Sequence, residues 1–164
     1  MDNLDNRVHQ SLTEHLELMK SRIAQKMAEL KRNASGRSVS SLTVVLEGMN
    51  KGYLEGAAQW EVMQQGRAKG KGPYNFREII REWITNKGIS IRPRGNESQE
   101  SALNSAAYLI TRSILSKGTA LYRSQGYDDV YDSVVNDEFN KLDHDIGAFF
   151  EADIDETNSL FIKG

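Results

Sequence analysis

The sequence contains no cysteine and no long apolar run. The absence of cysteine excludes disulfides, thiol catalysis and cysteine-ligated metal sites. No segment reaches the about 18 consecutive apolar residues that a membrane-spanning helix needs, and residues 1–10 lack the basic and apolar regions of an export signal. These absences predict a soluble, unexported chain whose stability comes from core burial or from partners.

Length and composition favour a single domain. The chain has 164 residues, of which 38% are hydrophobic, enough for one core and few for two. No internal repeat and no low-complexity linker divides it. We therefore predict one domain over residues 1–164, with a core at about 4–125 and an acidic C-terminal helix and tail at about 126–164.

The formal net charge of −2 conceals two segments of opposite sign. The segment from Arg67 to Arg94 contains eight Lys and Arg residues and two Glu. The segment from Asp128 to Glu156 contains eleven Asp and Glu residues and one Lys. Such patches can satisfy each other within one fold, or pair head to tail between copies and close a ring. They can also remain two solvated faces that bind nothing.

A long amphipathic helix is predicted over residues 4–32, roughly 40 Å at 1.5 Å per residue. Its apolar stripe at helical spacing consists of Leu4, Val8, Leu12, Leu16, Met19, Ile23, Met27 and Leu30. Asn33 and Gly36 supply the expected stop. A helix of this length either lies along a sheet or protrudes toward a neighbour, and packing on a sheet is favoured.

A β-hairpin should follow. Residues 42–46 are rich in β-branched and apolar side chains, the "GMNKG" stretch at 48–52 is typical of a hairpin connection, and the return strand begins at Tyr53. Gly56 indicates a bulge or a break. Beyond it, residues 57–65 suit either the rest of the strand or a helical turn.

Three further helices are predicted. The first begins at Phe76, with Asn75 as its N-cap and Glu78 completing a capping box, and it ends at Gly88. Its apolar stripe, Phe76, Ile79, Ile80, Trp83 and Ile84, is assigned to the core. The second covers about 99–116 and stops at Gly118. The third, capped by Asp128, extends to about Ile154. A short edge strand is expected at 119–127, and the apolar tail Leu160, Phe161 and Ile162 either docks on its own core or serves as an arm for a neighbour.

The predicted fold class is α+β: a small antiparallel sheet packed by a long N-terminal helix and further helices, with a long C-terminal helix.

None of the expected catalytic or ligand-binding motifs is complete. Gly66 to Gly72 falls one residue short of the Walker phosphate loop and has glycine where the magnesium-binding hydroxyl must stand. The three histidines, His9, His15 and His144, show no metal-ligand spacing and are expected at the surface. Residues 143–145, "DHD", point about 100° apart on a helix and cannot form a triad alone. We expect the acidic run to be a solvated face, and predict no enzyme, no cofactor and no metal.

Nucleic-acid binding has more support from the sequence than catalysis has. Tyr74, Phe76 and Trp83 lie among the cations of the basic segment, a mixture that backbone contacts and base stacking use. Phe76 and Trp83 fall on the apolar stripe of their helix, however. This leaves Tyr74 as the stacking candidate of a module that would bind through its basic, glycine-rich loop.

Four segments in order resemble the tail-completion and head-to-tail connector proteins of tailed bacteriophages. These segments are "SGRSVSSLTV" (35–44), "QGRAKGKGP" (65–73), "FREIIREWITNKGI" (76–89) and "AAYLITRSILSKGTALYR" (106–123), and together they span most of the chain. Lys69 and Tyr74 stand where the loop of relatives tends to carry prolines. The acidic final helix and the terminal "LFIKG" lie outside the family pattern.

The resemblance implies a structural virion protein without catalysis. Family members have a small sheet flanked by helices and form rings in the neck between the portal-bearing head and the tail. The expected partners are thus further copies of this chain and other neck, portal or tail proteins, with DNA only as passing cargo and no membrane. Carried over by position, the structural loop consists of Gly66, Arg67, Gly70, Lys71 and Pro73. With Lys69, these residues form the predicted interface loop. Because cations lining a DNA passage would grip the duplex, we expect the basic segment at a subunit interface and the acidic helix nearer the channel or the surface.

Overall fold

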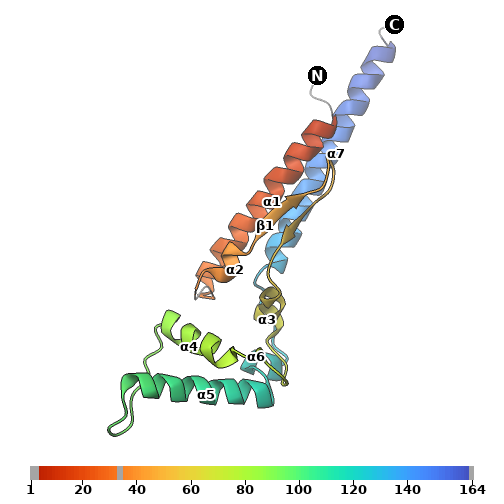
Figure 1. Ribbon diagram of the computed structural model, residues 1–164. Coiled ribbons are helices and arrows are strands. Elements are labelled where there is room, and N and C mark those ends of the chain that lie inside the picture. Colours follow the sequence, from red (N-terminus) through yellow and green to blue (C-terminus); the bar gives the residue numbers. More distant parts are fainter. Residues whose placement is uncertain (1–3, 33–34, 163–164) are drawn as a thin grey trace. The chain divides into compact units, whose positions relative to one another are not determined.

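The fold is α+β, mostly helical with one small antiparallel sheet (Figure 1). A computed structural model describes residues 4–32 and 35–162, with side chains described through residue 159. The elements in chain order are α1 (Leu4–Glu29), α2 (Arg37–Ser40), β1 (Thr43–Leu46), β2 (Gly52–Glu55), α3 (Gln59–Gln65), α4 (Phe76–Asn86), α5 (Gln99–Lys117), α6 (Ala120–Arg123) and α7 (Asp132–Ile162).

The chain packs as two compact units. Unit 1 consists of residues 1–30, 39–57 and 129–164, and unit 2 of residues 31–38 and 58–128. A single domain would unfold as one cooperative unit, and the packing alone does not test this. The single domain over residues 1–164 therefore stays a prediction.

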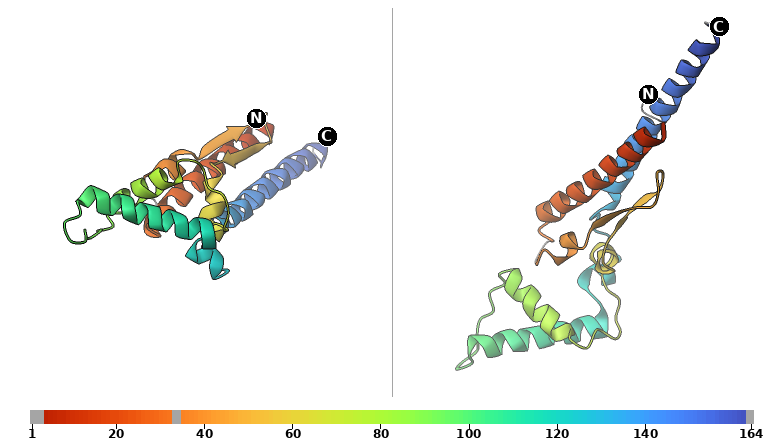
Figure 2. Two further views of the ribbon diagram at one scale, coloured as in Figure 1. Left: turned by 60° about the horizontal axis from the view of Figure 1, so that its bottom comes forward. Right: turned by 45° about the horizontal axis from the view of Figure 1, so that its top comes forward.

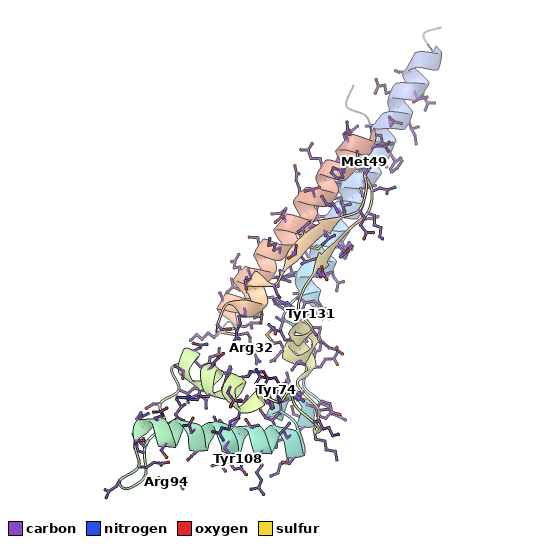
Figure 3. All side chains as sticks on the ribbon, viewed as in Figure 1. Arg32, Met49, Tyr74, Arg94, Tyr108 and Tyr131 are labelled. Carbon is purple, nitrogen blue, oxygen red and sulfur yellow. The ribbon has the colours of Figure 1, made fainter. Side chains whose placement is uncertain are left out.

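Unit 1 joins two long antiparallel helices and a hairpin. α1 and α7 lie side by side, with the β1–β2 hairpin along α1 (Figure 1). The hairpin register pairs Thr43 with Glu55 and Leu46 with Gly52. This arrangement confirms the favoured expectation that the N-terminal helix packs on a sheet. At the hairpin tip, Met49 (labelled in Figure 3) presents its carbonyl oxygen to His9 Nδ1 at 3.3 Å.

The core of unit 1 is built from the predicted helical stripe. The buried members are Leu12, Leu16, Met19, Ile23 and Met27 of α1, with Val130, Val134 and Leu142 from the α7 region. Val44, Leu46 and Leu54 from the hairpin and Ile146 from α7 pack against part of this core. α1 ends at Glu29, earlier than predicted, and Lys31 takes the left-handed backbone conformation (φ 52°) that stops it. The predicted stop at Asn33 lies outside the described residues.

Unit 2 is organised around the packing of α4 on α5 (Figure 2). Ile80, Ile84 and Ala107 are its buried centre, flanked by Phe76, Ile91, Leu103, Ala106, Ile110 and Ile114. Arg94 lies in the loop that joins the two helices, and Tyr108 lies on α5 (Figure 3). The sequence predicted both helices nearly to their ends, because their apolar faces meet each other.

Local expectations had mixed outcomes. Of the two alternatives for residues 57–65, the helical one is observed, because β2 ends at Glu55 before Gly56 and α3 follows from Gln59. The expected edge strand at 119–127 begins with a helical turn, α6, whose first N–H groups are capped by the Thr119 hydroxyl accepting from Tyr122 N. The short helix α2 was not predicted at all.

The predicted caps also differ. Asn75 makes no side-chain capping bond to α4, so the capping box is not formed. Ser98 caps α5 by accepting a hydrogen bond from Ser101 N. α7 begins at Asp132, after the predicted cap Asp128, and Asp129 Oδ1 accepts from Ser133 N at 3.1 Å. Within residues 4–32 and 35–162, no helix is long and apolar enough to cross a membrane.

Candidate interface loop and ionic network

The loop predicted as an interface, Gly66 to Pro73, connects α3 to α4 and is held against the segment joining α5 to α6. Arg67 N donates to Thr119 Oγ1 and Thr119 N donates to Arg67 O, each at 2.9 Å. Gly70 N donates to Leu115 O, also at 2.9 Å. Because these N–H groups are already bonded within the chain, they are not free to cradle a phosphate.

Two glycines allow the backbones of this junction to approach closely. Gly66 has φ 77°, and a Cβ there would lie 2.6 Å from both Thr119 Oγ1 and Tyr122 N. Gly118 has φ 80°, and its Cβ would lie 2.8 Å from Arg67 O. Neither position has room for a side chain, and both use a backbone region that other residues rarely adopt. The glycines are therefore required by the packing of the loop.

The predicted loop residues divide into an inward and an outward set. The Arg67 guanidinium lies 4.8 Å above the Phe76 ring centroid and donates to Lys71 O, so this cation holds the loop together. Lys69, Lys71 and Pro73 are exposed, as is Gly70. Within the described part of the chain neither lysine has an ion-pair partner. Beside them, the Tyr74 side chain is fully exposed.

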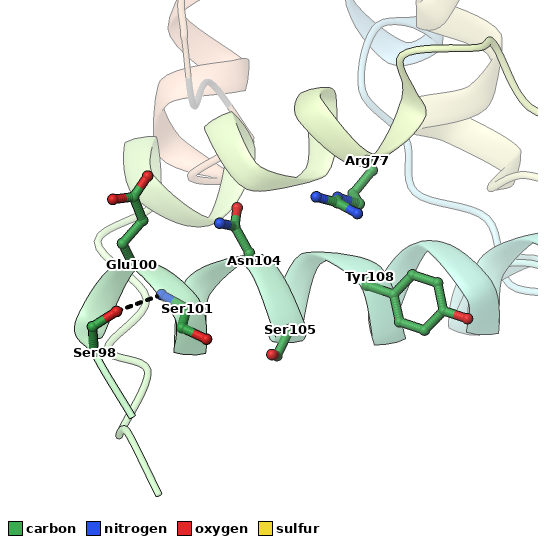
Figure 4. Close-up of a pocket in the computed structure, with 7 residues that line it drawn as sticks. All are labelled: Arg77, Ser98, Glu100, Ser101, Asn104, Ser105 and Tyr108. Carbon is green, nitrogen blue, oxygen red and sulfur yellow. Dashed lines mark hydrogen bonds between the residues drawn. The ribbon is translucent and has the colours of Figure 1, made fainter. Parts of the chain in front are cut away.

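Unit 2 carries a polar groove along α5 (Figure 4). It holds about 500 Å³ and is lined by Arg77, Ser98, Glu100, Ser101, Asn104, Ser105 and Tyr108. Glu100 is paired with Arg81, and Ser98 is occupied by its capping bond. The groove is open, and the hydroxyls of Ser101 and Ser105 donate to Glu97 Oε1 at 3.1 and 3.2 Å.

A second groove exposes part of the apolar face of α4. It holds about 230 Å³ and is lined by Ser35, Arg37, Gln59, Ile79, Trp83 and Asn86. Trp83 is 40% exposed and Ile79 is 36% exposed. Their assignment to the core was therefore wrong, because α5 covers only the Ile80 and Ile84 side of the helix. We call this feature the Trp83 groove.

An ionic network joins the two long helices of unit 1. His15 on α1 donates from Nδ1 to Glu138 Oε2 at 2.9 Å and from Nε2 to Asp145 Oδ2 at 3.1 Å, both on α7. Since a carboxylate only accepts, making both bonds requires a proton on each ring nitrogen, which is the imidazolium form of His15. His15 is 8% exposed. The expectation of a surface histidine was wrong here, whereas His144 is exposed and His9 is half-buried.

Glu138 is the centre of this network and is 1% exposed. Besides His15, Arg22 and Lys141 donate to it. Burial alone would raise the pKa of Glu138, but the hydrogen bonds from Lys141, His15 and Arg22 lower it to about 2. The predicted solvated acidic face is thus wrong at this position, because α1 covers it with two of the three cations.

His15 is held charged by the same contacts. Burial opposes the imidazolium, but the hydrogen bonds to Asp145 and Glu138 outweigh burial and raise the pKa of His15 above its ordinary value of 6.5. Both of its nitrogens are engaged by carboxylates, so it has no free position for a substrate proton. Within the described residues, no cluster of three or more His, Asp or Glu side chains is placed to hold a metal ion. The arrangement suits a fixed link between helices.

α7 extends past the start of α1 (Figure 1). The antiparallel contacts run from Lys26 with Asp129 to Arg7, whose guanidinium lies 4.4 Å above the Phe149 ring. Side chains 151–159 are all exposed, including Ile154 at 57%. We call residues 150–159 the α7 overhang. The predicted interface tail Leu160, Phe161 and Ile162 continues the α7 backbone, and its side chains lie outside the described part.

Comparison of the chain with protein-family models, with curated proteins and with solved structures gives no match.

Proposed function

We propose that the chain is a structural subunit of a tailed bacteriophage, which assembles into a ring in the neck between the portal-bearing head and the tail. It acts through contacts with copies of itself and with neighbouring neck, portal or tail proteins, and it performs no reaction. The proposal starts from the resemblance of the four sequence segments and is supported by the distribution of charge and exposed surface.

The observation that carries the proposal is the division of charge between the units. Unit 1 has seven Lys and Arg against seventeen Asp and Glu, a net charge of −10, whereas unit 2 has fourteen against six, a net charge of +8. A chain with one strongly acidic and one strongly basic part attracts other copies head to tail. When the rotation between copies closes, this heterologous contact produces a ring.

The packed loop also supports a structural role. Gly66 packs against Thr119 and Tyr122, and Arg67 donates to Lys71 O, whereas the side chains of Lys69 and Lys71 are exposed. A loop fixed in this way presents its cations in one geometry, which reduces the entropy lost on association. In a ring around passing DNA these cations belong at subunit contacts, because in the lumen they would bind the duplex and slow it.

Sedimentation velocity across concentration and salt tests the proposal. The purified chain is expected to form larger species as its concentration rises, and added salt should weaken this association because screening acts on exposed charges. The matched variant Lys69→Glu/Lys71→Glu should associate more weakly at low salt. A chain that is monomeric at every concentration and salt, alone and with portal or tail proteins, would contradict the proposal.

A second candidate, nucleic-acid binding by unit 2, is favoured by Tyr74. This ring is fully exposed beside Lys69 and Lys71, the combination of stacking surface and cations that single-stranded nucleic acid uses. Fluorescence anisotropy with labelled single-stranded and duplex DNA distinguishes it. The rival predicts tight binding with a steep salt slope that Tyr74→Ala weakens, whereas the neck-protein proposal predicts weak binding that is indifferent to this substitution.

A further inference from the structure

Two uncovered apolar surfaces of the chain match each other in geometry and charge. On α4, Ile79 and Trp83 are four residues apart and form an apolar ridge in the Trp83 groove. On α7, Phe150 and Ile154 are also four residues apart, and they are 50% and 57% exposed. Residues at this spacing lie on one face of a helix, so each pair presents a ridge that can pack beside the other.

The charges around the two ridges are opposite. The overhang carries Glu151, Asp153, Asp155 and Glu156, and none of these carboxylates has an ion-pair partner among the described residues. The ionisable side chain lining the Trp83 groove is Arg37, which pairs with Glu82. Next to Asn86, which also lines the groove, Lys87 donates to the backbone carbonyl of Lys31. Among the described residues, neither Lys87 nor Lys31 has a carboxylate partner.

We propose that the α7 overhang of one copy docks in the Trp83 groove of a second copy. Phe150 and Ile154 pack on Trp83 and Ile79, and the carboxylates of the overhang face Lys87 and Lys31. The inference rests on the proposed self-association and names its contact surfaces. It also gives a role to the acidic C-terminal helix, which lies outside the family resemblance.

Reach along the chain favours a contact between copies. α7 is continuous, so Ile154 lies about 33 Å from Asp132 at 1.5 Å per residue. The rim of the groove is tied to the chain just before α7, because Lys87 contacts Lys31 and the neighbouring Arg32 pairs with Asp128. An overhang docked in its own groove would require α7 to fold back, and a second copy meets no such constraint.

The cysteine-free chain allows a direct cross-linking test. Two full-length variants, Asn86→Cys with an enlarged tag and Ile154→Cys without it, are mixed and mildly oxidised. The expected product is a mixed disulfide dimer on a non-reducing gel. The control pairs Ile154→Cys with Leu109→Cys, which replaces an apolar side chain of α5 that is 61% exposed, and it should give at least about tenfold less dimer.

Equal yields with both partners would overturn the docking. So would a double variant, Asn86→Cys/Ile154→Cys, that forms its disulfide within one chain. In parallel, Trp83→Ala should weaken self-association at least about tenfold, since buried tryptophans dominate interfaces, whereas Tyr74→Ala should leave it unchanged. Circular dichroism verifies that both variants remain folded.

The failures can be told apart. If the wild-type chain self-associates in sedimentation but neither the mixed disulfide nor the Trp83→Ala loss is seen, the docking is wrong and the proposed function stands. If the wild-type chain does not associate at all, the docking fails together with the proposed function.

Discussion

The two units of the chain differ in where their charges lie. In unit 1, with a net charge of −10, α1 and α7 bury Glu138 and His15 between them and pair Arg22 and Lys26 across the same contact. In unit 2, with a net charge of +8, the centre is apolar, and Lys69 and Lys71 remain exposed. The comparison indicates that ion pairs join the helices of unit 1, whereas unit 2 packs through apolar side chains and leaves these loop cations at its surface.

The largest expected effect comes from removing the centre of the unit 1 network. Glu138→Ala leaves His15 and Arg22 without their buried carboxylate, and should lower the free energy of unfolding by about 3–5 kcal/mol. Urea unfolding followed by circular dichroism measures this loss. Asp143→Ala, at an exposed position of the same helix, is the control and should stay within about 0.5 kcal/mol of wild type. A Glu138→Ala loss no larger than the control's would mean that charge does not fix the helix pairing.

The corresponding change in unit 2 is at the loop. Gly66→Ala places a Cβ against Thr119 and Tyr122 in a backbone region reserved for glycine, and should cost about 2–3 kcal/mol. Gly147→Ala, in an open helical position of α7, should instead stabilise by about 0.5–1 kcal/mol.

Both tryptophans, Trp60 and Trp83, lie in unit 2, so their fluorescence follows that unit and circular dichroism follows the whole chain. Coincident transitions would support a single domain, and separate ones would refute it.

The two kinds of loop cation should respond differently. Arg67→Ala removes the ring contact with Phe76 and the bond to Lys71 O, and should cost about 1–2 kcal/mol. Lys69→Ala should change stability by less than about 0.5 kcal/mol, because that side chain is exposed. In the sedimentation experiment the order reverses, and Lys69→Ala should weaken association. Equal destabilisation by both substitutions would show that the inward and outward sets are not distinct.

The smallest expected effect is the loss of the His15 contribution to the stability of unit 1 as pH rises. The folded-state pKa of His15 is raised above 6.5, so its stabilisation is complete below pH 6.5 and is lost as pH rises through that raised value. The pKa of Glu138 falls from 4.5 to about 2, so its stabilisation is complete above pH 4.5 and is lost as pH falls toward 2. Denaturation of wild type and His15→Gln across pH should show that the variant lacks the alkaline decline. Parallel profiles above pH 6.5 would contradict the assignment.

Local patterns predicted the elements whose apolar faces are regular. α1, the hairpin, α4 and α5 follow from period and turn residues: α1 buries most of the face that its sequence marks, and α4 buries the Ile80 and Ile84 part of its face against α5. For residues 57–65 the sequence left a strand and a helical turn open, and α3 is the helical alternative. The turn α6 was missed because four residues are too few to show a helical period. The sequence showed that this loop is rich in glycine. The structure shows why Gly66 and Gly118 are needed: Gly66 lies against Thr119, and Gly118 lies against Arg67.

The site residues that were missed are non-local. His15 and Glu138 are 123 positions apart, and nothing in either neighbourhood marks them as partners. Their spacing gave one weak signal: both fall on or beside the apolar stripe of a long helix, where an ionisable residue needs a partner. The prediction that Trp83 lies in the core was wrong for another reason. Periodicity shows that a helix face is apolar but does not show whether another element covers it.

Cryo-electron microscopy of the purified chain at high concentration and low salt tests the central claim most directly. The account predicts closed rings in which unit 2 of each copy contacts the acidic α7 overhang of the next, with Lys69 and Lys71 at subunit contacts. Particles that remain single copies, or rings whose bore is lined by Arg67, Lys69 and Lys71, would contradict it.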